Sequence, residues 1–111
     1  MKLDTEMIGG ASLVTVRAAR IDAAVALDFR DRMREIAADT SGRLILDMTA
    51  VEFLDSSGLG AIVAAMKEME EGSRLELAGL GPTVAKVFRL TRMDSVFTIH
   101  ATRAAALTGA A

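Results

Sequence analysis

Hydrophobic and polar positions follow two different periods along this chain, and these periods predict an alternation of strands and helices. Short apolar or alternating runs of strand length lie at 12–17, 43–48, 74–78 and 95–99, and 51–54 carries the chain onward from the second of these. A further run at 3–8 precedes Gly9-Gly10, and this turn lets it pair with 12–17 as a hairpin. These segments supply the strands of the predicted fold.

Helical spacing covers the stretches between these strands. Predicted helices occupy 23–38, about 57–71, a stretch that begins near Pro82, and 102–107. Asp22 stands where the first of these helices needs an N-cap. Because strands and helices alternate, we predict one α/β domain over 1–111, with about four helices and a sheet that is parallel over its later strands.

The apolar positions also predict which side chains form the core. Four phenylalanines, Phe29, Phe53, Phe88 and Phe97, all fall within apolar patterns. Most of the seven methionines occupy apolar helical or strand positions. We therefore expect both residue types to pack inside the domain, where methionine fills irregular gaps between other side chains.

The most informative segment is 55–60, whose sequence Asp-Ser-Ser-Gly-Leu-Gly follows a predicted strand and opens the second helix. Asp55, Ser56 and Ser57 can each act as the N-cap, and the pattern leaves that choice open. Unpaired N–H groups and the positive end of the helix dipole meet there, so the fold would tolerate a phosphate on a first-turn serine. That phosphate would add a charge of about −1.5 to −2 beside Asp55 and repel a docked partner. The segment is therefore a candidate switch.

Two glycines in this segment fit the same hypothesis. Gly58 and Gly60 lower helix stability relative to alanine, and we expect that they leave the backbone of the first turns accessible to a partner. The alternative is that Ser56 and Ser57 only cap the helix and have no further role.

Composition limits the classes of function. The chain has 111 residues, of which 51% are hydrophobic and 25% charged, as in an ordinary single globular domain. It has no cysteine, which excludes disulfides and thiolate metal sites. No apolar run approaches the roughly 20 residues of a membrane helix, and the first residues lack the apolar core of a signal peptide. We therefore expect a cytoplasmic protein.

Charge and aromatic content give little support for nucleic-acid or lipid binding. The net charge is −2, which supplies no general attraction to polyanions. Tryptophan and tyrosine are absent, so stacking platforms for bases are scarce. Lys86, Arg89 and Arg92 form a small basic face on the third helix, which we expect to be solvated. We expect no direct contact with nucleic acid or with a membrane.

Catalytic and cofactor motifs are missing from the sequence. His100 is the single histidine, far from the serines along the chain, and we expect it to be structural. A nucleophile elbow around Ser56 fails because Leu54 occupies the first glycine position. The glycine pairs at 58–60 and 79–81 lack the third glycine of a dinucleotide loop, and no NTPase phosphate loop occurs. With no clustered metal ligands either, we expect neither an enzyme nor a bound cofactor.

With the motif placed between strand and helix, the chain resembles the STAS domains, and within them the bacterial anti-sigma factor antagonists. The resemblance runs over nearly the full length. Its most specific parts are the strand at 44–47 and the segment 53–60, which is similar to the D-S-[ST]-G-[LI]-G signature of the family. Ile21-Asp22 and Gly81-Pro82 are further matches. The resemblance implies a mixed sheet flanked by helices and no catalytic activity.

The resemblance also implies a regulatory cycle. In the antagonists, a serine-kinase anti-sigma factor, which is a GHKL-type ATPase, phosphorylates the second hydroxyl residue of the signature, and this residue corresponds to Ser57. A serine phosphatase reverses the step. The unphosphorylated protein, a monomer or weak dimer, binds the anti-sigma factor and releases the sigma factor. Partner contacts are then expected at Asp22, Asp55, Ser56, Gly58, Leu59 and Gly60.

Two other functions stay open on the sequence. One is a constitutive STAS scaffold, such as the small subunit of a lipid-transport ABC complex or a component of a stressosome-like assembly. The other is a sensor that binds a nucleotide or a small anion at the helix N-terminus. One residue departs from the family pattern, because Ala19 stands where a glycine usually precedes Asp22. The departure affects the backbone beside Asp22 and leaves Ser57 untouched.

Overall fold

Seven strands, four α-helices and one 3₁₀ turn make up the part of the chain that the structure, a computed structural model, describes, which is residues 1–108. In chain order the elements are β1 (Leu3–Ile8), β2 (Ala11–Val16), β3 (Arg20–Ile21), α1 (Ala23–Ala38), β4 (Arg43–Asp47), β5 (Phe53–Leu54), α2 (Ser56–Glu68), β6 (Arg74–Ala78), α3 (Pro82–Leu90), η1 (Met93–Ser95), β7 (Thr98–His100) and α4 (Arg103–Thr108).

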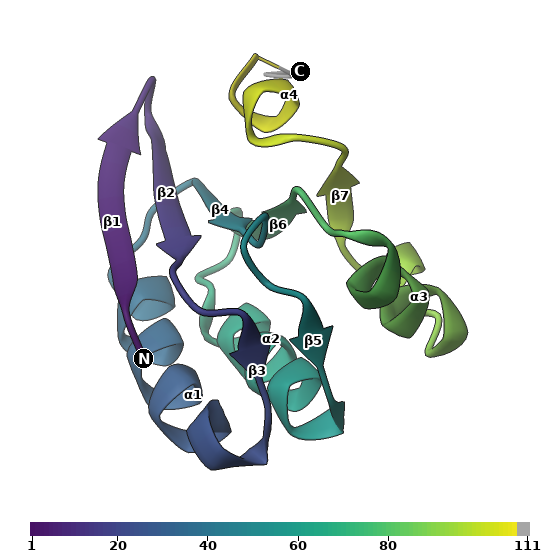
Figure 1. Cartoon of the computed structure of the whole chain (residues 1–111). Helices are drawn as coiled ribbons and strands as arrows, with labels where there is room; N and C mark the ends of the chain where they lie inside the picture. Colours follow the sequence, from purple (N-terminus) through teal and green to yellow (C-terminus); the bar gives the residue numbers. More distant parts are fainter. Residues whose placement is uncertain (109–111) are drawn as a thin grey trace.

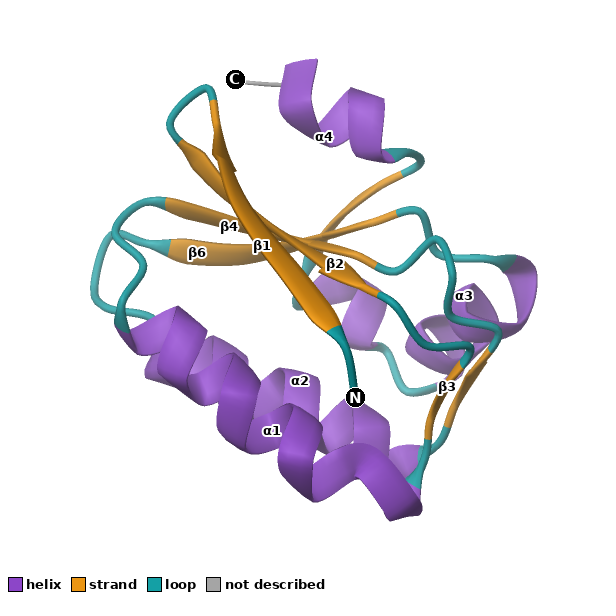
Figure 2. Ribbon diagram, turned by 60° about the vertical axis from the view of Figure 1, so that its left-hand side comes forward, coloured by secondary structure: helices purple, strands orange, loops and turns teal. Residues whose placement is uncertain are grey.

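The main sheet has five strands in the order β1-β2-β4-β6-β7. β1 and β2 form the predicted antiparallel hairpin, whereas the pairs β2–β4, β4–β6 and β6–β7 are parallel. α1 and α2 lie side by side on one face of the sheet, and α4 lies over the opposite face (Figure 1 and Figure 2). The prediction of a mixed, mostly parallel sheet flanked by four helices is confirmed.

Side chains on the two faces of the sheet build two apolar clusters. The larger cluster joins the sheet to α1, α2 and α3, and its fully buried members include Val14, Val16, Leu44, Leu46, Leu77, Phe29, Met33, Ile62 and Phe88. The smaller cluster joins Leu13, Ile45 and Ala78 to Ala106 of α4. Successive residues of β2 and β4 therefore alternate between the clusters, which is the two-residue period of strands buried on both faces.

Several predicted boundaries are wrong by one to three residues. α2 begins at Ser56 and ends at Glu68, because the backbone of the next residue is extended. The last strand is Thr98–His100, and not 95–99, because a 3₁₀ turn follows Arg92, whose φ of 61° is left-handed. The terminal helix starts one residue later than predicted, at Arg103.

A second sheet of only two short strands was not predicted. Within the connecting stretch 51–54, Phe53–Leu54 forms a strand that pairs in parallel with Arg20–Ile21. Phe53, which we expected in the core, is half-buried, and its ring centre lies 4.1 Å from the Arg20 guanidinium carbon. A cation over an aromatic face is an attractive contact at a surface site. It helps to hold the two short strands together.

A buried carboxylate, Glu76 on β6, fastens α4 to the sheet through its neighbours. Its side chain is almost fully buried, and it accepts hydrogen bonds from Arg43 Nη2 at 2.6 Å and from Arg74 Nε at 2.6 Å. His100 Nε2 lies 2.8 Å from the same carboxylate. Arg43 also donates to the carbonyl oxygen of Ala106 in α4 at 2.8 Å. We call Glu76, Arg43, Arg74 and His100 the Glu76 cluster, which accounts for His100 as a structural residue.

The Glu76 cluster predicts a loss of stability in acid. Burial by itself raises the pKa of the Glu76 carboxyl, but the hydrogen bonds from Arg43, His100 and Arg74 outweigh it and bring the pKa from 4.5 to about 2. The depressed pKa stabilises the fold fully above pH 4.5, and this contribution, about 3 kcal/mol, is lost as the pH falls through about 2.

Urea unfolding between pH 6 and pH 2 measures this contribution. The free energy of unfolding of the Glu76→Gln variant should depend less on pH below 4.5 than that of the unchanged protein, because glutamine has no proton to take up. Parallel pH curves for the two proteins would contradict the assignment.

Candidate functional site

The segment 55–60 sits where the first turns of α1 and α2 meet. The structure resolves the choice of cap, because the N-cap of α2 is Asp55, whose Oδ1 accepts a hydrogen bond from the Gly58 amide at 3.0 Å. Its Oδ2 accepts from the amide of Ala23, the first residue of α1, at 3.1 Å. One carboxylate therefore holds free N–H groups of both helices, each at the positive end of a helix dipole.

Asp22 is the N-cap of α1, as predicted. Its Oδ1 accepts from the Ala24 amide at 3.1 Å, and its Oδ2 accepts from Arg20 Nε at 3.3 Å. Asp22 and Asp55 are both half-buried. The two carboxylates, which the sequence placed among the partner-binding residues, are therefore engaged inside the protein in holding the helix ends.

The short β3–β5 sheet sets the spacing of these helices. Arg20 pairs with Phe53 and Ile21 with Leu54, directly before the two N-caps. Parallel pairing makes the two segments enter their helices in the same direction, so α1 and α2 start level with each other. The Asp55 amide adds a hydrogen bond to the Ile21 carbonyl at 3.4 Å.

Gly58 has a different role from the one predicted. It is buried, and a Cβ at this position would clash with the Ile21 carbonyl oxygen and lie 2.6 Å from Leu54 Cδ1. Glycine is therefore required for α2 to approach β3, and the expectation that Gly58 leaves the backbone accessible is wrong. Gly60 is exposed, and a Cβ there would meet nothing within 4 Å, so at this position the expectation is confirmed.

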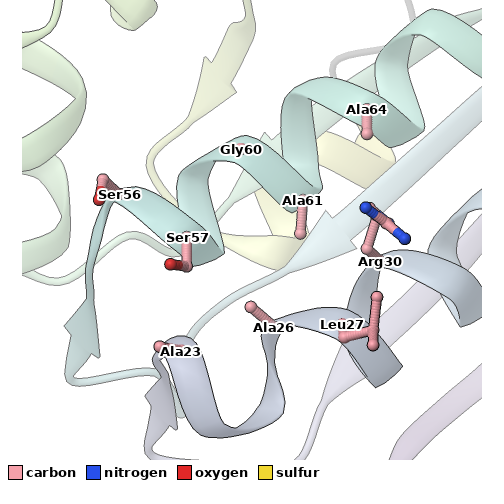
Figure 3. A pocket seen from close by; sticks show the side chains of 9 residues that line it. All are labelled: Ala23, Ala26, Leu27, Arg30, Ser56, Ser57, Gly60, Ala61 and Ala64. Atoms are coloured by element: carbon pink, nitrogen blue, oxygen red, sulfur yellow. The ribbon is translucent and has the colours of Figure 1, made fainter.

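Ser56 and Ser57 are the first two residues of α2, and both are exposed. Neither hydroxyl is needed as the cap, because Asp55 supplies it. Ser57 projects from α2 toward α1, whereas Ser56 lies at the outer end of the helix (Figure 3). Leu59 is half-buried and packs against the main core, so only part of this side chain is open to a partner.

A groove of about 460 Å³ runs between the two helices beside Ser57, and we call it the α1–α2 groove. Its walls are mostly small and apolar, as Figure 3 shows. The lining residues are Ala23, Ala26, Leu27, Arg30, Ser56, Ser57, Gly60, Ala61 and Ala64. Sequence reasoning missed Leu27 and Arg30. A usable signal was present, because Leu27 is a large apolar residue outside the buried stripe of α1, and it is 61% exposed.

Neither a metal-binding cluster nor a helix that could span a membrane occurs among the described residues. Within residues 1–108, no group of three or more histidine, aspartate or glutamate side chains could hold a metal ion. In the same residues, no helix has the length and apolar character needed to cross a bilayer. The arrangement presents two exposed hydroxyls beside an open groove.

Comparisons with known proteins give consistent results. A family model for the STAS domain matches residues 2–106. The anti-sigma-F factor antagonist RsfB of Mycobacterium tuberculosis is 29% identical over 89 residues, or 80% of this chain and 73% of that protein. The anti-sigma-B factor antagonist of Listeria monocytogenes is 30% identical over 83 residues, or 74% and 73%. The crystal structure of an anti-sigma factor antagonist from Mycobacterium paratuberculosis has a TM-score of 0.88 at 29% identity, covering 97% of this chain and 92% of that one.

Alanine at position 58 should destabilise the domain, because the added methyl group has no room beside β3. We expect Gly58→Ala to lower the free energy of unfolding by about 1–3 kcal/mol. Gly60→Ala is the matched control in the same turn, and it should raise that free energy by about 0.5–1 kcal/mol because alanine favours the helix. Urea denaturation measures both, and equal stability of the two variants would refute the close approach of α2 to β3.

Asp55→Ala should destabilise the domain more than Asp22→Ala. Loss of an N-cap costs about 0.5–2 kcal/mol, and Asp55 in addition holds the first amide of the neighbouring helix. Hydrogen exchange followed by NMR should show the Ala23 and Gly58 amides exchanging faster in Asp55→Ala. Unchanged protection of Ala23 in that variant would mean that Asp55 does not join the helices.

Proposed function

The chain belongs to the STAS domain family and to its anti-sigma factor antagonists, and on this premise we propose that it is a partner-switching regulator controlled at Ser57. The observation that carries the proposal is the position of Ser57. Ser57 is exposed and lines one end of the α1–α2 groove, while the capping of α2 rests on Asp55. A phosphate on Ser57 would therefore alter the surface without removing a bond that the fold needs.

The proposed cycle has two partners. A serine-kinase anti-sigma factor of the GHKL type transfers the γ-phosphoryl group of ATP to Ser57 Oγ, with ADP as the leaving group and loss of the hydroxyl proton. A serine phosphatase hydrolyses the phosphoserine and restores the hydroxyl. The unphosphorylated protein binds the anti-sigma factor and frees the sigma factor for transcription, and the phosphorylated protein is released.

The physical basis of release is charge at a docking surface. Phosphoserine carries about −1.5 to −2 charges, which a partner docked over the first turn of α2 would have to desolvate. The two helix N-termini supply partial positive charge nearby, so the folded state tolerates the modification. We propose that Ser56, Leu59 and Gly60 contact the partner directly. Asp22, Asp55 and Gly58 act indirectly, because they position the two helices.

In this proposal the protein has no catalytic activity and no cofactor, because the partners perform the phosphoryl transfer and the hydrolysis. It acts in the cytoplasm without direct contact with nucleic acid or a membrane, as a monomer or weak dimer.

Phosphorylation is tested with the GHKL-type serine kinases of the source organism, each purified and incubated with this protein and ATP. Mass spectrometry should place phosphate on Ser57 for at least one kinase, and the Ser56→Ala variant should be modified as well as the unchanged protein. Modification by no kinase, or only at other residues, would overturn the proposal.

The consequence of the charge is tested with two substitutions at one position. Ser57→Asp should weaken binding to that kinase at least about tenfold, because it places a permanent carboxylate on the docking surface. Ser57→Ala should bind as tightly as the unphosphorylated protein and should not respond to ATP. Isothermal titration calorimetry measures both, and thermal unfolding serves as the control for folding. Binding of Ser57→Asp as tight as that of Ser57→Ala would contradict the electrostatic mechanism.

A further inference from the structure

The α1–α2 groove has an apolar floor made of small side chains. Four alanines, Ala23, Ala26, Ala61 and Ala64, keep the facing surfaces of the two helices low. Leu27 stands beside them and is 61% exposed, one of few large apolar side chains on the surface of the described residues. An exposed apolar side chain that continues an apolar hollow can mark a protein-interaction surface.

Arg30 is the single charged residue among those that line the groove, and its side chain is incompletely paired. Its Nε is buried and has no hydrogen-bond partner among the described residues. Its Nη2 makes only a long contact of 3.4 Å with Asp31, and the side chain remains 42% exposed. In Figure 3 the guanidinium lies beside Ala64, between the two helices. The buried Nε is closed to a partner, but the exposed part of the guanidinium can pair with a carboxylate.

We infer that the α1–α2 groove receives an apolar side chain of the anti-sigma factor kinase, and that a neighbouring carboxylate of the kinase pairs with Arg30. The inference rests on the proposed function and adds the chemistry of the partner's contact. Leu27 and the alanine floor bind the apolar group, and Arg30 sets which sequences fit, because a carboxylate is favoured and a cation is repelled.

This contact explains how a phosphate on Ser57 would act on the partner. Ser57 stands at one end of the groove and Arg30 faces Ala64, seven residues further along α2, so the two points are roughly 10 Å apart by the rise of a helix. This separation is about one Debye length at physiological ionic strength. Salt screening therefore leaves only a weak repulsion between the kinase carboxylate on Arg30 and the new phosphate, which adds to the larger cost of desolvating the phosphate.

Binding of groove variants to the kinase that modifies Ser57 tests the inference. Leu27→Ala and Arg30→Glu should each raise the Kd about tenfold or more. Leu90→Ala and Arg89→Glu are the matched controls, because both residues are exposed on α3 and lie outside the groove. The controls should keep the Kd of the unchanged protein within about twofold.

Two further measurements separate a specific contact from general damage. Thermal unfolding should show all four variants folded, since the substituted side chains are largely exposed or half-exposed. Exchange of the paired kinase carboxylate for arginine should restore the binding of Arg30→Glu and weaken that of the unchanged protein. Failure of every acidic position on the kinase surface to restore binding in this way would overturn the assignment to a carboxylate.

Failure of the groove inference can be distinguished from failure of the proposed function. If the kinase phosphorylates Ser57 and binds Leu27→Ala and Arg30→Glu as tightly as the unchanged protein, the groove inference fails and the proposed function stands. If no kinase phosphorylates Ser57, the proposed function fails, and the groove inference falls with it. The groove could instead hold a second copy of this protein, and sedimentation of the protein alone tests this alternative. A dimer that dissociates in Leu27→Ala would assign the groove to the second copy and overturn the inference.

Discussion

The structure around Ser57 depends on one carboxylate. Asp55 accepts hydrogen bonds from Gly58 in its own helix and from Ala23 at the start of the neighbouring helix. Two helix N-termini repel each other unless an anion lies between them, and Asp55 supplies that anion. Because both of its oxygens are engaged, the hydroxyls of the next two residues are not needed for capping. Ser57, the candidate modification site, is thus left exposed because Asp55 and not Ser57 caps the helix.

Close packing of the two helix ends held by Asp55 leaves a groove between α1 and α2. The β3–β5 pairing starts the helices level with each other, and Gly58 lets α2 lie against Ile21. The alanines that follow keep the helix faces low enough to leave a groove between them. The opposite face of the sheet carries a separate stabilising cluster around Glu76. The larger core and the groove therefore share the α1–α2 face of the sheet, whereas the Glu76 cluster fastens α4 to the opposite face.

The sequence was sufficient where a signal is long and periodic. The helix at 23–38 and its Asp22 cap were predicted correctly, because sixteen residues carry several turns of apolar spacing. The pairing of Arg20–Ile21 with Phe53–Leu54 was not predicted. A strand of two residues shows no period, and its partner is distant along the chain. The prediction for Gly58 was wrong for a similar reason, because the carbonyl oxygen that requires glycine belongs to Ile21, which is distant along the chain. The groove at Leu27 likewise exists only once α2 is in place.

The link between the two helix ends has a consequence for how a signal is carried. Asp55 ties the groove walls together at one end, so the proposed docking would need less ordering of the protein, which lowers the entropic cost of binding. With a preorganised surface of this kind, the signal would not depend on a change of fold. In the proposed cycle, phosphorylation and dephosphorylation at Ser57 Oγ would change this surface without unfolding the protein, so one copy could serve many cycles.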